Sequence, residues 1–345
     1  MSLYLDIEKR LGNFHLKIKL EAGDETVALL GASGSGKSLT LRCIAGIERP
    51  DRGKIVIDGV TVFDSEKKID LPPQKRRVGI LFQNYALFPH MTVLENIRAG
   101  AMRVRNTAAV AEIMEHMGLT ALADRYPRQL SGGEQQRAAL ARILVSKPEI
   151  LLLDEPFSAL DSHLRFRLEQ QVRQIIRDFD GSVLLVSHDR DEVFRMSDRI
   201  AVVDGGHLQT VGTVSQVFAD PVTRSGAVLT GCKNVSAAEK LSPDGIVAAD
   251  WGVTLQIPAT DRSVDAVGIR MHDIVPGNGE NSVLCRVVEV VENPFSVTVM
   301  VKAKPDAAPI GVELPKERWK QLESDSIQIC LPPEKLLLLQ ERNDL

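Results

Sequence analysis

Eight residues near the N-terminus, GASGSGKS at 31–38, match the pattern G-x-x-x-x-G-K-[ST] that cradles phosphate groups. They follow an apolar run at 27–30 and precede a stretch with helical character. Glycines in such a loop allow successive backbone N–H groups to point at one anion, and the helix N-terminus behind them adds a positive dipole end. The residues predicted to bind nucleotide phosphates are Gly31, Ser33, Gly34, Ser35, Gly36, Lys37, Ser38 and Leu39.

Two side chains of this loop have expected roles in chemistry. Lys37 is predicted to reach the β- and γ-phosphates, and the Ser38 hydroxyl to ligate the Mg²⁺ that bridges them. The alternative is a plain connection between a strand and a helix; the strand, the lysine and the serine together favour the phosphate site. Kinases, GTPases, motors and transporters all use such a loop, so the activity depends on the rest of the chain.

A second feature is the run ILLLDEP at 150–156, in which apolar residues end in two acids. Continuous apolar runs are typical of buried parallel strands, whose carboxyl ends hold the ligands of open α/β sheets. Asp154 is predicted to hold Mg²⁺ through its water shell, and Glu155 to polarise an attacking water. A solvated turn is the alternative, and the phosphate loop earlier in the chain favours the paired role.

A third feature is LSGGEQQR at 130–137, which opens a helix rich in alanine and leucine. Ser131 and Glu134 have the spacing of a capping box, which alone explains these two residues. The pair Gly132–Gly133 weakens the first turn of the helix, and we expect no packing reason for it. Bare glycines at the positive end of a helix suit close approach to phosphate.

With these segments, the chain resembles the ATP-binding subunits of ABC transporters, whose signature L-S-G-G-[QE] stands at 130–134. The resemblance covers about residues 1–230. It implies that Gln83 forms the glutamine loop, which reads the metal site and faces the membrane partner. It also implies that Asp161, in SALD at 158–161, crosses a dimer interface, and that His188 contacts the γ-phosphate.

The resemblance implies a mechanism with ATP and Mg²⁺ as cofactors. Two copies pair head to tail, so that Ser131, Gly132 and Gly133 of one copy meet the γ-phosphate held by Lys37 of the other. Glu155 and His188 then orient water for in-line attack. One departure concerns the base, because Leu11 stands where the family usually has an aromatic residue, and Phe14 is the nearest aromatic.

The expected fold is an α/β P-loop NTPase cassette at 1–230 with a helical subdomain at about 84–145. A stretch of apolar residues at spacings of four and three predicts one amphipathic helix after Asp161. Short valine-rich runs beyond 233 predict a small all-β barrel at 233–345, similar to the TOBE/MOP-like barrels of ABC importer ATPases. The barrel either braces the dimer or senses substrate.

Composition excludes several classes of function. The chain has 345 residues, 44% of them hydrophobic and 26% charged, with a formal net charge of -4. Nucleic acid is therefore not expected as a partner. No apolar stretch approaches the roughly 20 residues of a spanning helix, so we expect a peripheral protein on the cytoplasmic face of the cell membrane. The four cysteines are far apart, which argues against metal ligation.

The segment 85–96, which follows Gln83, is rich in apolar residues for a loop. It either packs between subdomains or forms a groove that receives a short helix of a transmembrane permease. Permease subunits are therefore expected partners, together with an extracytoplasmic solute-binding protein that acts through them.

Segments at 11–14, 71–77 and 230–235 most resemble ATPases of molybdate or tungstate import. Sulfate, polyamine, iron and sugar importers remain alternatives, because cargo is chosen by other subunits. A translation or DNA-repair ATPase is disfavoured, because the chain has one cassette and no heptad run. An ATP-dependent regulator that senses a ligand through the barrel is the alternative from another class.

Overall fold

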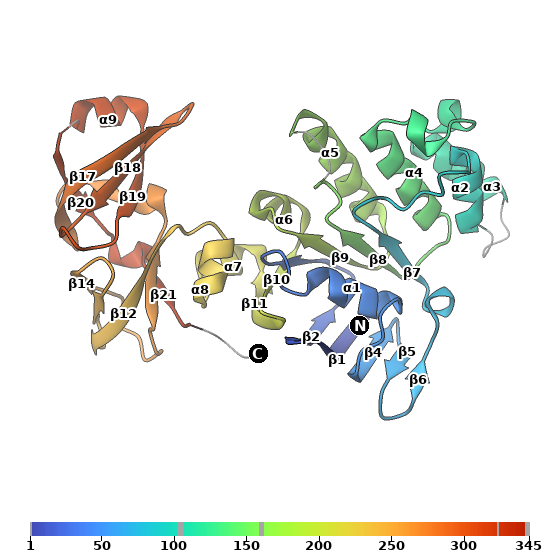
Figure 1. The fold of residues 1–345 in the computed structure, drawn as a ribbon, viewed down its shortest axis with the longest axis horizontal. Helices are drawn as coiled ribbons and strands as arrows, with labels where there is room; N and C mark the ends of the chain where they lie inside the picture. Colours follow the sequence, from blue (N-terminus) through green and yellow to red (C-terminus); the bar gives the residue numbers. More distant parts are fainter. Residues whose placement is uncertain (1, 102–106, 159–161, 323, 342–345) are drawn as a thin grey trace. The chain divides into compact units, whose positions relative to one another are not determined.

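The computed structural model describes residues 2–101, 107–158, 162–322 and 324–341. The chain divides into two compact units, Met1–Val214 and Ser215–Asp344. Both units are drawn in Figure 1, in blue to green for the first and in yellow to red for the second. This division reflects compactness alone, so the boundary between functional domains that the sequence predicts at 230–233 stays a prediction.

Unit 1 is built on one eleven-stranded sheet with the order β6-β5-β4-β1-β2-β11-β10-β3-β9-β8-β7. The strands β10, β3, β9, β8 and β7 are parallel, whereas β1, β2, β4, β5 and β6 pair in antiparallel fashion. The eleven strands are β1 (Leu3–Leu11), β2 (Phe14–Ala22), β3 (Thr26–Leu30), β4 (Arg52–Ile57), β5 (Val60–Asp64), β6 (Ile69–Asp70), β7 (Val78–Leu81), β8 (Ile150–Asp154), β9 (Ser182–Ser187), β10 (Arg199–Asp204) and β11 (His207–Thr213).

The central strands β3, β8 and β9 are buried at every position. Strands covered on both faces read as continuous apolar runs, which is why the sequence showed no alternation here. Their carboxyl ends are followed by the phosphate loop, by Glu155 and by His188. The sheet thus brings three distant segments to one edge.

Helices flank this sheet, and three of them pack together as the helical subdomain beside β7 (Figure 1). These three are α2 (Val93–Ala101), α3 (Thr107–His116) and α4 (Gly132–Leu144). The others are α1 (Lys37–Ala45), α5 (Ser162–Asp178) and α6 (Arg190–Met196), with short 3-10 turns at Pro73–Lys75, Thr120–Leu122 and Pro127–Gln129. The predicted P-loop cassette with a helical subdomain is confirmed.

Unit 2 contains two five-stranded antiparallel sheets that share one apolar core. This nearly closed, barrel-like arrangement confirms the predicted small all-β fold. The first sheet has β12 (Asn234–Ser242), β13 (Gly245–Ala248), β14 (Val253–Gln256), β15 (Ala266–Ile269) and β21 (Leu337–Leu339). The second has β16 (Val275–Pro276), β17 (Ser282–Glu292), β18 (Ser296–Lys302), β19 (Ile310–Pro315) and β20 (Ser326–Cys330).

Three helices and two 3-10 turns complete the described part of the chain. The helices are α7 (Val214–Ala219), which begins at the division between the units, α8 (Arg224–Leu229) and α9 (Lys316–Leu322). The turns lie at Met271–Asp273 and Pro333–Lys335. The core of unit 2 includes both tryptophans of the chain, Trp251 and Trp319.

The helix behind the phosphate loop is held at its C-terminal end by Arg76, whose side chain is fully buried. Its guanidinium donates hydrogen bonds to the carbonyl oxygens of Cys43 at 2.8 Å and Ile44 at 3.0 Å, and to Asp70 at 2.9 Å. The α1 helix ends at Ala45, and the next residue, Gly46, has φ of +76°, where a Cβ atom would lie 2.5 Å from Arg76 Nε. Arg76 therefore caps the last carbonyls of α1 and fixes the position of this helix.

Replacing Arg76 by Met is expected to lower the unfolding free energy of unit 1 by about 2–4 kcal/mol, because buried carbonyl groups lose their donor. Arg49 pairs with the same carboxylate at 3.4 Å but is 73% exposed, so Arg49→Met is expected to cost less than about 1 kcal/mol. Urea unfolding measures both, with tyrosine fluorescence reporting unit 1 and tryptophan fluorescence unit 2. Equal losses in the two variants would contradict the capping role.

Candidate active site

The phosphate loop lies between the end of β3 and the start of α1, as the sequence indicated. Its backbone turns through left-handed conformations at Gly34 (φ +79°) and Gly36 (φ +105°). A Cβ atom on Gly36 would lie 2.6 Å from Leu16 and 3.1 Å from Phe14. Both the backbone angle and the close neighbours therefore require glycine at this position.

Lys37, the first residue of α1, folds back over the loop and is only 4% exposed. Its ammonium group donates hydrogen bonds to the carbonyl oxygens of Gly31 and Ala32, each at 2.8 Å. Burial lowers the pKa of Lys37, while the carboxylates of Glu155 and Asp154 oppose this shift. The charge of Lys37 is thus placed at the loop and close to the acids at the end of β8.

Ser38 and Asp154 are brought into direct contact. The Ser38 hydroxyl donates to Asp154 Oδ1 at 2.7 Å, and Asp154 is 6% exposed at the end of β8. Burial raises the pKa of Asp154, and the hydrogen bond from Ser38 opposes this. A hydroxyl and a carboxylate side by side form the hard oxygen donor set that Mg²⁺ prefers, so these residues fit that ion.

Glu155 and His188 also meet, across the ends of β8 and β9. His188 Nδ1 lies 3.3 Å from Glu155 Oε1, with the histidine side chain 60% exposed and the glutamate 22%. Glu155 has φ of +47°, and its N–H donates to Val186 O at 3.0 Å. Strained backbone of this kind persists where the surroundings hold it and concentrates at functional sites.

Gln83 joins the same neighbourhood through Ser158. Gln83 Nε2 donates to Ser158 Oγ at 3.1 Å, and Ser158 Oγ donates to Glu155 O at 3.1 Å. The segment after β7 is therefore linked to the backbone of the acid pair. Asp161 lies outside the described residues.

The signature segment forms the N-terminus of α4. Ser131 Oγ accepts from Glu134 N at 3.4 Å, and Glu134 accepts from Ser131 N at 2.7 Å, so the predicted capping box is confirmed. A Cβ atom on Gly133 would lie 3.0 Å from a methyl group of Leu168 on α5. The expectation that Gly132–Gly133 has no packing reason is therefore wrong for Gly133.

Among the described residues, no hydrogen bond or ion pair joins the signature segment to the phosphate loop or to the acid pair of the same chain. The capping partners of Ser131 are local. Of the two residues considered in the sequence as contacts for the base, Leu11 is 48% exposed, whereas Phe14 lies against Gly36 of the phosphate loop. Phe14 thus places an aromatic ring beside this loop.

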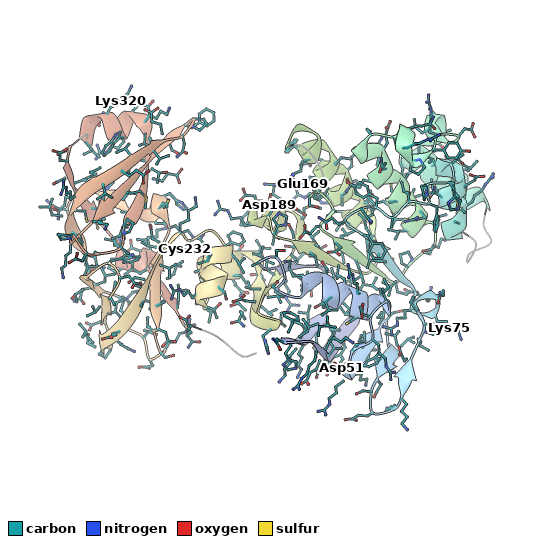
Figure 2. The ribbon with its side chains drawn as sticks, in the orientation of Figure 1. Asp51, Lys75, Glu169, Asp189, Cys232 and Lys320 are labelled. Carbon is teal, nitrogen blue, oxygen red and sulfur yellow. The ribbon has the colours of Figure 1, made fainter. Side chains whose placement is uncertain are left out.

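A partly buried network of polar side chains on α5, α6 and the end of β9 was missed from sequence. Glu192, 5% exposed on α6, accepts from Ser187 Oγ at 3.0 Å, and Ser187 Oγ accepts from Asp189 N at 3.0 Å. Arg165 of α5 pairs with Asp189 at 3.1 Å, and Glu169 of α5 pairs with Arg195 of α6. Figure 2 labels Asp189 and Glu169 within this region. An acid in the first turn of a helix gives no sequence signal of burial.

Burial raises the pKa of Glu192 to about 8, against the opposing effect of the Ser187 hydrogen bond. The neighbouring charges act in both directions, because Asp189 and Glu169 raise this pKa and Arg165 lowers it. The carboxyl group of Glu192, four positions after His188, therefore keeps its proton to a higher pH than an exposed glutamate does.

Comparison with known proteins identifies the class. The family model described as "ABC transporter" matches residues 13–158. The molybdenum import ATP-binding protein ModC of Paramagnetospirillum magneticum is 42% identical over 225 residues, 64% of this chain and 62% of that protein. The trehalose/maltose import ATP-binding protein MalK of Thermococcus litoralis is 40% identical over 304 residues, 80% of each chain.

Among solved structures, the post-hydrolysis dimer of the ATP-binding cassette MJ0796 bound to ADP and Pi matches with a TM-score of 0.52 at 28% identity. That match covers 62% of this chain and 99% of the cassette. The chain belongs to the ABC transporter family. Within that family it is an importer-type ATPase, which couples ATP hydrolysis to transport. No helix in the described part of the chain is long and apolar enough to cross a bilayer.

Replacing Glu192 by Gln is expected to flatten the pH dependence of stability. The folded chain keeps a proton on Glu192 that the unfolded chain loses above its usual pKa of 4.5, so rising pH destabilises the native protein between about pH 5 and 8. Glu192→Gln should not show this decrease in the free energy of unfolding, which is on the order of a few kcal/mol between about pH 5 and 8. Urea unfolding followed by tyrosine fluorescence at several pH values measures the free energy of unfolding. The same pH dependence in both proteins would contradict the prediction.

Proposed function

We propose that this chain powers the import of a small oxyanion of the molybdate or tungstate type. The observation that carries the ATPase part is the meeting of Lys37, Ser38, Asp154, Glu155 and His188 at one edge of the sheet. The cargo part is supported by the molybdenum import relative at 42% identity. A sugar importer is the second candidate, because the trehalose/maltose relative aligns over more of the chain; sulfate, polyamine and iron remain further alternatives.

In the proposed mechanism, the N–H groups of residues 31–39 bind the phosphates, and Lys37 turns from two carbonyl oxygens to phosphate oxygens. Ser38 and Asp154, with Gln83, would hold Mg²⁺, which neutralises charge on the phosphates. Glu155 accepts the proton of a water that attacks the γ-phosphorus, the bond to the ADP oxygen breaks, and phosphate leaves. His188, beside Glu155, orients this water and the γ-phosphate.

We further propose that two copies are needed, head to tail. The amides of Gly132 and Gly133 and the Ser131 hydroxyl are placed at the positive end of α4, where they suit a phosphate. Their capping contacts are local, so their ligand comes from the phosphate loop of a second copy. Asp161 would lie at the same interface. The similarity to a cassette that forms a dimer supports this arrangement.

The remaining partners follow from the importer class. Permease subunits would contact the segment 85–96, and a solute-binding protein outside the membrane would deliver cargo to them. The chain would then work at the cytoplasmic face of the membrane. As functional domains we propose the cassette at 1–230, with its helical part at about 84–145, and the accessory barrel at 233–345, which braces the dimer or senses the oxyanion.

Replacing Glu155 by Gln is expected to lower ATP hydrolysis at least about 100-fold while ATP binding is kept, because the proton acceptor is lost. With ATP present, the variant should accumulate as a dimer in light scattering, and adding Lys37→Ala should return it to a monomer. Glu112→Gln, an exposed glutamate of α3, is the matched control with normal hydrolysis. A normal rate in Glu155→Gln would exclude Glu155 as the base, and full activity as a monomer would exclude the paired site.

In the cell that carries this chain, Lys37→Ala is expected to abolish uptake of labelled molybdate and leave maltose uptake unchanged. The reason is that loss of phosphate binding stops one importer only. The exposed Lys75 supplies the matched control, Lys75→Ala, which should import normally (Figure 2). Loss of maltose uptake with molybdate uptake intact would overturn the oxyanion assignment in favour of sugar import.

A further inference from the structure

The segment Tyr85–Thr92, between β7 and α2, is held in an uncommon backbone shape. Tyr85 (φ +58°) and Ala86 (φ +45°) are two successive non-glycine residues in the left-handed region. Each such residue costs of order 1 kcal/mol, and the conformation persists only where neighbouring groups over-determine it. The neighbours that hold this segment are therefore informative about its role.

The first anchor is Arg142, near the C-terminal end of α4. Its guanidinium donates to Ala86 O at 2.8 Å and to Tyr85 O at 3.1 Å, so both left-handed residues are held through their carbonyls. The same group lies over the ring of Phe88, 5.2 Å from its centroid. One planar cation thus binds two carbonyl oxygens and one aromatic ring of the segment, each in a fixed direction.

The second anchor is Asn96 of α2, which is fully buried. Its Oδ1 accepts from Phe88 N at 2.8 Å, and its Nδ2 donates to the carbonyls of Phe88 at 3.2 Å, Met91 at 3.1 Å and Thr92 at 3.0 Å. The helices that supply the two anchors are in tight contact, because a Cβ atom on Gly100 of α2 would lie 2.0 Å from Arg142 O. The segment, α2 and α4 therefore form one body.

The residues just before this segment are anchored to the central sheet. Gln83 bonds to Ser158, next to the acid pair, and β7 pairs with β8 of the central sheet. Between Gln83 and Tyr85 the chain passes from groups anchored to the catalytic sheet to groups anchored to α4.

We propose that Arg142 is a positioning residue that couples the signature helix to the segment Tyr85–Thr92. When the N-terminus of α4 engages nucleotide at Ser131, the Arg142 clamp displaces the segment together with the helix, and Phe88, 41% exposed, moves with it. The inference rests on the proposed function for two points: that Ser131 meets nucleotide and that the segment meets a permease. The clamp itself rests on the contacts above.

Hydrogen exchange on the full-length chain, with and without a non-hydrolysable ATP analogue and Mg²⁺, tests the coupling. The reporters are the amides of Tyr85, Ala86 and Met91 in the segment, and the amides of Glu134 and Gln135 at the start of α4. The variants are Arg142→Met and, as matched control, Arg98→Met, which removes an exposed arginine of α2.

In the unsubstituted chain and in Arg98→Met, nucleotide is expected to change exchange at both sets of amides. In Arg142→Met, exchange of the segment is expected to rise about tenfold without nucleotide, as for loss of a charged hydrogen bond. Its response to nucleotide should fall to a small fraction of that in the unsubstituted chain, the part that Asn96 of α2 still transmits, while the start of α4 responds in full. A purely stabilising contact would raise the exchange but leave the response in place, and that result overturns the coupling.

Arg142→Lys keeps the charge but loses the planar fork that donates along two fixed directions and the guanidinium face over Phe88, so about half of the response should return. This variant tests the proposal if Arg142→Met does not fold. A full response in a folded Arg142→Lys protein would show that the guanidinium of Arg142 is not required, and would overturn the proposed coupling. Failure of α4 to respond in the unsubstituted chain is a different result: it removes the proposed contact of Ser131 with nucleotide and the coupling with it.

Discussion

The candidate active site depends on the parallel pairing of three buried strands. In the register of this sheet, Leu30 pairs with Ser187 and Asp154 with Val186, so the phosphate loop, Glu155 and His188 all follow at the same edge. Apolar burial on both faces fixes this register, because a slip would expose side chains that now exclude water. The relative positions of the site residues thus follow from the packing of β3, β8 and β9 in the core of the sheet.

Local patterns gave the correct account where neighbours in sequence decide the structure. The loop at 31–38 is followed by a helix over Lys37–Ala45, as its pattern indicated, and Ser131 forms its capping box. Burial by distant elements could not be read in this way. The residues next to Arg76 and Glu192 in the sequence do not predict that these side chains are buried, because the groups that cover them come from other parts of the chain.

Gly133 shows the limit most directly. Its sequence context suggested a bare backbone kept for a ligand, and the structure adds a packing cause in Leu168, thirty-five positions away.

The two carbonyl partners of Lys37 have a consequence for selectivity. The ammonium group has already lost most of its water, so an arriving anion exchanges acceptors on it and does not strip it of solvent. Neutral ligands offer nothing better than the carbonyls already there, and a weakly charged anion offers little more. In the proposed function, a polyphosphate would replace these carbonyl partners because it has dense negative charge and backbone amides to meet it, so the loop would select its ligands by charge density.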